Sequence, residues 1–258
     1  MAGRLEGKRA VVTGAGAGIG RATALRFAAE GAAVLANDIA AGGLASLASE
    51  LRERGARVET QVADIGVAAN AEAAAELAVA RFGRLDIWVN NAGGALPAPF
   101  PDTDEARYRA DLSRNLDSAW FGCQAALRVM AQQRSGAIVN LSSAGALLAT
   151  DGLHAYSAAK AGILSLTRTL AREYGPLGIR VNAIAPGPIL TPAFAEFLES
   201  LPDGGRSRGR QVPLGRLGTP EEIAAAIVFL ASDDASYVSG VTLPVDGARS
   251  AILAPPRG

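Results

Sequence analysis

Short apolar runs alternate with amphipathic stretches along most of the chain. The runs have the length of buried strands, and the stretches between them repeat apolar residues at helical spacing. Strands are predicted at residues 9–13, 33–37, 57–62, 85–89, 136–141, 178–184 and 241–245. Strands that alternate with helices favour a parallel sheet covered by helices on both faces, which is an α/β fold.

The predicted helices occupy residues 21–30, 40–55, 70–83, 108–134, 156–174 and 219–232. The last begins with Thr219 as N-cap, Pro220 at the first helical position and Glu222 at the third, which is a capping box. No repeat or domain boundary interrupts the pattern, so we expect a single domain over residues 1–258. Residues at about 190–216 differ, because an apolar face with two Phe precedes a Gly- and Arg-rich tip. This texture predicts a lid over a site, although a plain surface insertion has the same texture.

Glycines crowd the turn between the first strand and the first helix. From Thr13 to Gly20 the chain reads Thr-Gly-Ala-Gly-Ala-Gly-Ile-Gly, which fits Thr-Gly-x-x-x-Gly-x-Gly but not the general G-x-G-x-x-G fingerprint. Glycine lets the backbone approach a pyrophosphate, and the following helix presents free N–H groups to it. The turn therefore predicts a dinucleotide site, with a tight turn that holds no ligand as the alternative.

Asp38 closes the second strand about 20 positions after the glycines, where a carboxylate can accept hydrogen bonds from ribose hydroxyls. It would repel a 2′-phosphate, no Arg precedes Arg21 in the turn, and none directly follows Asp38. The sequence thus favours NAD over NADP, and a turn or helix cap is the alternative role of Asp38. Asp64 and residues 90–93 also follow strands, at the sheet edge where ligands bind.

Tyr156 and Lys160 are four residues apart, so on a helix they share one face. An ammonium near a phenol lowers the phenol's pKa from its ordinary value of about 10, which suits proton exchange with an alcohol or a carbonyl. Ser143, thirteen residues upstream, could hydrogen-bond the same substrate oxygen. Lys8 and Lys160 are the only lysines among 25 cationic residues, so a Lys rather than an Arg at position 160 points to its chemistry.

Composition narrows the class of protein. Hydrophobic residues make up 49% and charged residues 19%, and the formal charge is zero with Arg scattered, so no basic face indicates nucleic acid. No apolar run reaches the length that spans a bilayer, and no apolar segment marks a secretory signal, so we predict a cytoplasmic protein. One Cys, one His and no Cys/His cluster argue against a zinc site, and Cys123 fits a core position.

With these residues in place, the chain from about Leu5 to Gly247 resembles the short-chain dehydrogenase/reductase family. The resemblance rests on motifs in order: residues 13–20, Asp64, residues 90–93, Asn115, Ser143, Tyr156 with Lys160, and Pro186-Gly187 with Thr191. One departure is Gly145, which follows Ser143 sooner than the family's Ser-Ser-x-x-Gly pattern. The resemblance implies a single Rossmann-like domain with a doubly wound parallel sheet of about seven strands, an NAD cofactor and a homotetramer.

The resemblance also implies roles for individual residues. Tyr156 would be the general acid/base, Lys160 would lower its pKa and bind ribose, and Ser143 would polarise the substrate oxygen. Asn115 would hold a water that links Lys160 to solvent. The remaining residues would bind the cofactor: Gly14, Gly18, Ile19 and Gly20 at the pyrophosphate, Asp38 at ribose, Asp64 and Ile65 at adenine, Asn91, Ala92 and Gly93 along the cleft, and Pro186, Gly187, Ile189 and Thr191 at the nicotinamide.

These observations predict hydride transfer between NAD and a secondary alcohol or ketone that is fairly apolar or cyclic. The substrate expectation rests on the pocket loops, which carry Leu96, Leu147, Leu148, Phe194 and Phe197. An NADPH-dependent 3-oxoacyl thioester reductase, a dinucleotide-sensing protein and a non-catalytic scaffold remain as alternatives. His154, the only histidine, is either a loop or capping residue or a substrate contact.

Overall fold

Seven parallel strands form one sheet in the computed structural model, which describes residues 3–94, 97–201 and 206–251. The order across the sheet is β3-β2-β1-β4-β5-β6-β7. The strands are β1 (Arg9–Thr13), β2 (Ala33–Asp38), β3 (Val58–Val62), β4 (Ile87–Asn90), β5 (Gly136–Leu141), β6 (Ile179–Pro186) and β7 (Thr242–Val245). The predicted doubly wound, Rossmann-like α/β fold is confirmed.

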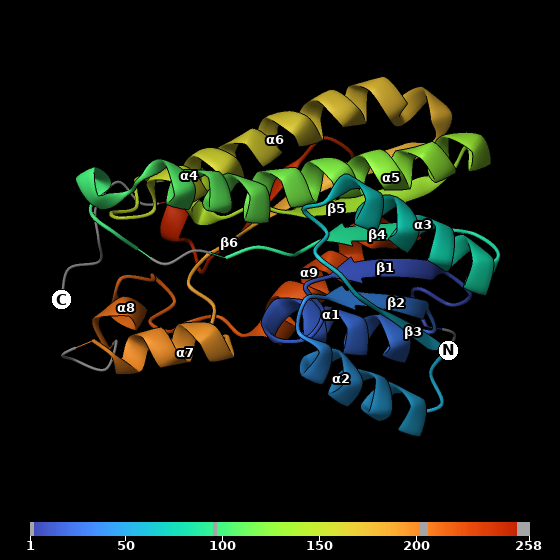
Figure 1. The fold of residues 1–258 in the computed structure, drawn as a ribbon, viewed down its shortest axis with the longest axis horizontal. Coiled ribbons are helices and arrows are strands. Elements are labelled where there is room, and N and C mark those ends of the chain that lie inside the picture. Colours follow the sequence, from blue (N-terminus) through green and yellow to red (C-terminus); the bar gives the residue numbers. More distant parts are fainter. Residues whose placement is uncertain (1–2, 95–96, 202–205, 252–258) are drawn as a thin grey trace.

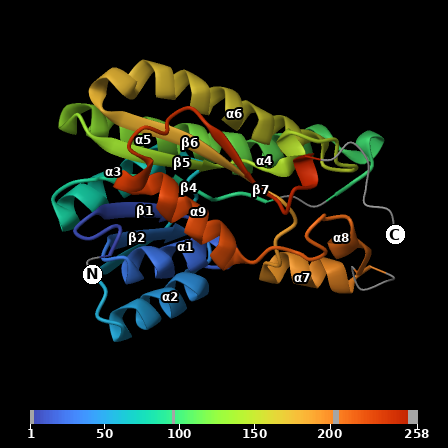
Figure 2. The same cartoon turned by 180° about the vertical axis from the view of Figure 1, so that it is seen from behind.

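Helices cover both faces of this sheet (Figures 1 and 2). On one face lie α1 (Gly18–Ala29), α2 (Ala41–Glu53) and α9 (Pro220–Ala231). The other face carries α3 (Ala68–Phe82), α4 (Glu105–Leu112), α5 (Ser118–Gln133) and α6 (His154–Tyr174). Two shorter helices, α7 (Pro192–Glu199) and α8 (Arg206–Arg210), lie beyond the carboxyl ends of the strands (Figure 1).

The strands are apolar on both sides because each side meets a helical layer. In β1, Ala10 and Val12 pack into the core beneath α1 and α9, whereas Val11 packs into the core beneath α3 and α5. This alternation is the two-residue period of a strand. It explains why the strands appear in the sequence as continuous apolar runs.

The helix predicted over residues 108–134 is interrupted in the structure. A π-helical turn, Ser113–Asp117, separates α4 from α5 and contains the buried Asn115. Inserted turns of this kind are frequent at functional sites. The hydrophobic pattern of the sequence did not predict the inserted turn, because helices α4 and α5 lie directly on either side of it.

The strand order changes direction at β1, which pairs with β2 on one side and with β4 on the other. Strands β2 and β3 extend the sheet on the first side, and β4 to β7 extend it on the second. In open α/β sheets this switch point leaves a crevice outside the carboxyl ends of the strands. Within the described residues, no helix is both long and apolar enough to cross a membrane.

Candidate active site

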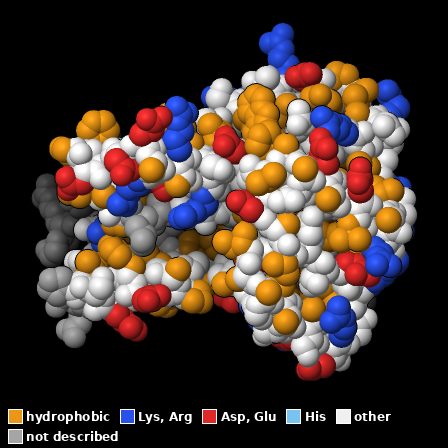
Figure 3. All heavy atoms as spheres, viewed as in Figure 1, with side chains coloured by type: hydrophobic (Ala, Val, Ile, Leu, Met, Phe, Trp, Pro, Cys, Tyr) orange, Lys and Arg blue, Asp and Glu red, His pale blue; other side chains and the backbone are white. Residues whose placement is uncertain are grey.

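A cavity of about 890 Å³ opens beyond the carboxyl ends of the strands. Figure 3 shows the surface hollowed between the part that carries α4 and the part that carries α7. Most of the residues predicted to form a site line this one cavity: Gly14, Gly18, Ile19, Asp38, Asp64, Ile65, Asn91, Ala92, Gly93, Ser143, Tyr156, Lys160, Pro186, Gly187, Ile189 and Thr191. Gly20 and Asn115 are not among its lining residues.

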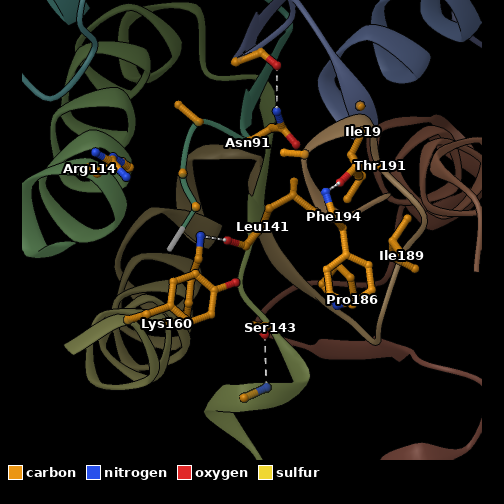
Figure 4. A pocket seen from close by; sticks show the side chains of 18 of the residues that line it. Ile19, Asn91, Arg114, Leu141, Ser143, Lys160, Pro186, Ile189, Thr191 and Phe194 are labelled. Carbon is orange, nitrogen blue, oxygen red and sulfur yellow. Dashed lines mark hydrogen bonds between the residues drawn. The ribbon is translucent and has the colours of Figure 1, made fainter. Parts of the chain in front are cut away.

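Lys160 projects from α6 into the cavity, although only 4% of its surface is exposed. Its Nζ donates a hydrogen bond to the carbonyl oxygen of Leu141 at 2.8 Å, which Figure 4 shows. Burial lowers the pKa of Lys160 from 10.5 to about 8, because the charged form is poorly solvated there. The ammonium also lies 5.6 Å from the ring centre of Tyr156, so the two side chains share one face as predicted.

Tyr156 is paired with Ser143. Burial raises the pKa of the Tyr156 phenol above its ordinary value, and the hydrogen bond with Ser143 acts in the opposite direction. The lowered pKa predicted from the neighbouring ammonium is wrong for the protein alone, because burial removes water around the phenol. The protein groups alone therefore favour the neutral phenol.

Ser143 is held by the short 3₁₀ turn that follows it, Ala144–Ala146. Its Oγ accepts a hydrogen bond from the backbone N–H of Gly145 at 3.0 Å, which leaves its own proton available to donate (Figure 4). A Cβ added at Gly145 would be in ordinary contact, 3.4 Å from that Oγ. The early Gly145 therefore does not displace Ser143 from the cavity.

Asn115 holds the loop after β4 in place through side-chain hydrogen bonds to the backbone. Its Oδ1 accepts from the backbone N–H of Gly94 at 3.0 Å, and its Nδ2 donates to the carbonyls of Gly94 and Asp111 at 3.0 and 2.9 Å. A Cβ on Gly93 would lie 2.6 Å from Asn115 Oδ1 and 3.1 Å from Lys160 Nζ. The loop approaches both side chains closely only because position 93 is glycine. Sequence reasoning missed this fastening role, and the water-holding role stays a prediction.

The glycine turn is tied to the end of β4. Asn91 Nδ2 donates to the carbonyls of Thr13 and Gly14 at 2.9 and 3.0 Å, while Thr13 Oγ1 accepts from the backbone N–H groups of Asn91 and Ala92. Gly14 has φ +63°, which is why glycine is needed there. Gly20 serves packing rather than the cavity surface, since a Cβ there would lie 2.0 Å from the carbonyl oxygen of Gly14.

The N-terminus of α1 fits a phosphate group. Its N-cap, Ala17, offers no side-chain hydrogen bond, and its first turn holds no acidic residue. The first N–H groups of the helix are therefore free of capping side chains, and Ala17 and Gly18 both line the cavity. This arrangement fits the pyrophosphate of a dinucleotide.

Asp38 lies beside the glycine turn on the same cavity wall. Its two carboxylate oxygens accept backbone hydrogen bonds from Gly16 at 2.8 Å and Ala40 at 2.9 Å, so the carboxylate is held in place. Each oxygen keeps a free lone pair that a ribose hydroxyl could use. Arg21 pairs with Glu50 at 2.6 Å and does not line the cavity.

Asp64 and Ile65 line the cavity beside the end of β3. The Asp64 Oδ1 accepts from the backbone N–H of Gly66 at 2.8 Å. On the far side, the hydroxyl of Thr191 caps α7 by accepting from Phe194 N–H at 3.3 Å (Figure 4). Ile189 lies 8% exposed beside it. The predicted adenine and nicotinamide residues thus mark two ends of one cavity.

The structure places only some of the residues of the predicted pocket loops at the cavity. Phe194 and Phe197 of α7 line the cavity, but Leu147 and Leu148 do not, and Leu96 lies outside the described residues. His154 is exposed, contacts the ring of Phe100 edge-on with centroids 4.9 Å apart, and is not among the lining residues. Sequence reasoning missed Gln211, Arg208 and Arg249, which also line the cavity. The Arg-rich composition of the tip was the available signal for Arg208.

A family model described as enoyl-(acyl carrier protein) reductase matches residues 14–248. Among curated proteins, a 3-oxoacyl-[acyl-carrier-protein] reductase of Thermotoga maritima is 41% identical over 95% of this chain and 98% of its own. A cis-4-hydroxycyclohexanecarboxylate dehydrogenase of Sinomonas cyclohexanicum is 44% identical over 94% and 96%. An L-rhamnose 1-dehydrogenase (NAD(P)⁺) of Azotobacter vinelandii is 42% identical over 93% and 95%.

Solved structures agree with these sequence relatives. Levodione reductase superposes with a TM-score of 0.92 at 37% identity, over 96% of this chain and 99% of that chain. A 7α-hydroxysteroid dehydrogenase, in complex with NADH and 7-oxo glycochenodeoxycholic acid, has a TM-score of 0.89 at 37% identity, over 95% and 94%.

Proposed function

The chain belongs to the short-chain dehydrogenase/reductase family, whose relatives here are oxidoreductases of alcohols and ketones, and from this premise we propose an NAD-dependent secondary-alcohol dehydrogenase. One observation carries the proposal: a single cavity contains the glycine turn, Asp38, and the group formed by Ser143, Tyr156 and Lys160. A dinucleotide along one wall would bring its reactive end toward these three side chains. This arrangement supports hydride transfer next to a proton donor and acceptor.

The protein's own groups handle the proton. In alcohol oxidation, the Tyr156 oxygen takes the hydroxyl proton of the substrate, and in ketone reduction it returns one. Ser143 donates a hydrogen bond to the substrate oxygen. Lys160, held by the carbonyl of Leu141, supplies a fixed positive charge next to Tyr156.

The raised pKa of Tyr156 sets a condition on oxidation, because the phenol must lose its proton before it can act as a base. An oxidised nicotinamide bound in the cavity supplies the hydride acceptor and a positive charge that favours the phenolate. Reduction has the opposite requirement, and the neutral phenol favoured by burial satisfies it.

Asp38 supports NAD as the cofactor. Its carboxylate is fixed by two backbone N–H groups at the cavity wall, and it would repel a 2′-phosphate. The relatives include a dehydrogenase named for both NAD and NADP, so this proposal rests on Asp38 itself. Phe194 and Phe197 support a fairly apolar or cyclic substrate.

The alternative with a specific observation in its favour is reduction of a 3-oxoacyl thioester, since a relative at 41% identity is named for that activity. Asp38 argues against NADPH, the cofactor expected for that alternative. A dinucleotide sensor would have no need of Ser143, Tyr156 and Lys160 together.

We also propose a homotetramer in which the long helices pair between copies. The exposed Trp120 of α5, at 52%, and Tyr108 of α4, at 43%, support an apolar contact on that layer. A monomer in sedimentation equilibrium would contradict this proposal.

The experiment that tests the activity is reduced-nicotinamide absorbance with purified protein. NAD⁺ or NADP⁺ is offered with aliphatic, cyclic, steroid, sugar and 3-hydroxyacyl alcohols. Turnover with NAD⁺ and cyclic or steroid alcohols is the expected result. Turnover with NADP⁺ alone, confined to 3-hydroxyacyl thioesters, would replace the proposal by the biosynthetic alternative. No turnover with any alcohol, together with tight cofactor binding, would support a dinucleotide-sensing protein.

A further inference from the structure

Two arginines line the cavity without a carboxylate partner. Arg208 comes from α8 and Arg249 from the short 3₁₀ turn Arg249–Ala251 after β7, and both side chains are half-buried. Within the described residues, neither guanidinium takes part in an ion pair or a hydrogen bond. An unpaired guanidinium at a cavity wall keeps its N–H donors available to an anionic ligand.

The two segments that carry these arginines are in contact. The backbone N–H of Leu214 donates to the carbonyl of Gly247 at 3.4 Å, and a Cβ on Gly247 would lie 2.4 Å from Val212 Cγ1. The stretch after α8 is therefore packed against the turn after β7. Arg208 precedes the first stretch and Arg249 follows Gly247, so this packing brings the segments that carry the two cations together beside β7.

The sheet order places this end on the substrate side. Arg249 follows β7, which lies at the edge of the sheet beside β6, whereas the glycine turn follows β1 and Asp38 follows β2. Ser143 follows β5, which lies in the sheet between β7 on one side and β1 and β2 on the other. Arg249 is therefore separated from the proposed phosphate and ribose positions by the strands that carry Ser143 and the 186–191 segment.

Acidic groups nearby do not neutralise the pair. The carboxylate of Asp246 is 7% exposed and accepts the backbone N–H groups of Ala248 and Ser250 at 3.0 and 2.8 Å. Asp151 is exposed and also lines the cavity, but no ion pair joins it to either arginine among the described residues. Backbone N–H groups satisfy Asp246 and solvent surrounds Asp151, so neither carboxylate forms an ion pair with the two arginines.

We infer that Arg208 and Arg249 bind an anionic group of the substrate, so that this enzyme acts on alcohols or ketones that carry a carboxylate away from the reacting carbon. The inference rests on the proposed function and names its substrate class. Phe194, Phe197 and Leu153 line the same cavity and suit an apolar body between the two polar ends of such a molecule. Guanidinium groups suit a carboxylate because their N–H donors match its two oxygens.

Matched substrates test this directly. We would measure kcat/KM with NAD⁺ for 4-hydroxycyclohexanecarboxylate, its neutral carboxamide and the cationic 4-(aminomethyl)cyclohexanol, each as both isomers. The carboxylate should be preferred over the carboxamide about tenfold or more, as expected of charge-assisted hydrogen bonds. The preference should also shrink at high salt. Equal rates for all three, or a preference for the amine, would overturn the inference while leaving the alcohol dehydrogenase intact.

Variants then assign the preference to the two residues. Arg208→Gln and Arg249→Gln should each lower kcat/KM for the carboxylate about tenfold and leave the carboxamide within about twofold. Arg210→Gln is the matched control, because Arg210 is exposed on the same helix and does not line the cavity. A loss with both substrates, or the same loss in Arg210→Gln, would assign the preference elsewhere and overturn the inference.

A binding measurement separates this inference from the activity. Cyclohexanecarboxylate and cyclohexanecarboxamide have no hydroxyl group to oxidise, so calorimetric titration in the presence of NADH measures recognition alone. Tighter binding of the carboxylate that is lost in Arg208→Gln would support the anion site even without turnover. Equal binding of the two compounds would overturn the anion site, whether or not alcohols are oxidised.

Discussion

The ammonium of Lys160 donates a hydrogen bond to the main-chain carbonyl of Leu141 at 2.8 Å and thereby ties α6 to the end of β5. Because Lys160 is 4% exposed, the protein holds a cation where water cannot solvate it fully. The same helix carries Tyr156, and the same strand leads into Ser143. This one bond therefore connects the two elements that carry the three proposed catalytic residues.

We predict that Lys160 makes stability depend on pH in the alkaline range. Its pKa is lowered by burial from 10.5 to about 8. Between these values the unfolded chain binds a proton that the folded chain has released, so the free energy of unfolding should rise with pH, by at most about 3 kcal/mol. Urea unfolding from about pH 7 to pH 10 measures this rise, and Lys160→Met should abolish it.

Lys8→Met is the control for this measurement, since Lys8 is the other lysine and pairs with Asp233 at the surface. It should keep the rise with pH. The range ends near pH 10 because the raised pKa of Tyr156 acts in the opposite direction above the ordinary value of a phenol. A rise of equal size in wild type and Lys160→Met would show that another group is responsible.

The second prediction separates chemistry from binding at Tyr156. Tyr156→Phe removes the hydroxyl and keeps the ring, so kcat should fall about 10²- to 10⁴-fold. Cofactor affinity, followed by fluorescence titration with NADH, should change less than about twofold. In wild type, alcohol oxidation should increase and ketone reduction decrease as the pH rises, because burial keeps the phenol protonated. Persistent turnover in Tyr156→Phe would remove Tyr156 from the proposed role.

Local patterns in the sequence were sufficient for the layered fold and for most of the cavity. Buried strands appear as apolar runs, and the residues that follow them reach a common edge by topology alone. For this reason Asp38, Asp64, Asn91 and Ser143 could be assigned to one site without a structure. The four-residue interval between Tyr156 and Lys160 worked in the same way, because a helix converts it into a shared face.

Properties that depend on packing could not be predicted. The pKa of Tyr156 is raised because the phenol is buried, and burial is decided by the loops around it rather than by the interval to Lys160. Arg208 and Arg249 are 41 positions apart, as their numbers show, and tertiary contacts of Gly247 with Val212 and Leu214 bring their segments together. The glycine pattern also did not reveal that a Cβ on Gly20 would lie 2.0 Å from the carbonyl oxygen of Gly14, and the role of Gly20 at the pyrophosphate stays a prediction.

The third prediction concerns Cys123, which packs in the core beside β4 and β5, as expected from its apolar surroundings. Burial raises the pKa of its thiol to about 12, and its Sγ accepts from Asn90 Nδ2 at 3.2 Å. The thiolate is the reactive form, so the native protein should not react with a thiol-specific disulfide reagent at neutral pH. One equivalent should react after denaturation. Rapid reaction of the folded protein would show that this part of the core opens readily.

The last prediction concerns cofactor choice at Asp38. Asp38→Asn keeps the size of the side chain and removes the charge that would repel a 2′-phosphate. The ratio of kcat/KM for NADP⁺ to that for NAD⁺ should rise about tenfold or more, since one unit charge near another at the protein surface is worth a few kcal/mol before screening. Asp64→Asn is the control, because Asp64 lines the same cavity beside β3 and its Oδ1 is similarly held by a backbone N–H. It should change the ratio much less. A wild-type preference for NADP⁺ would show that the carboxylate of Asp38 does not select the cofactor. An equal shift of the ratio in both variants would show that the overall charge of the cavity, and not Asp38 in particular, selects it.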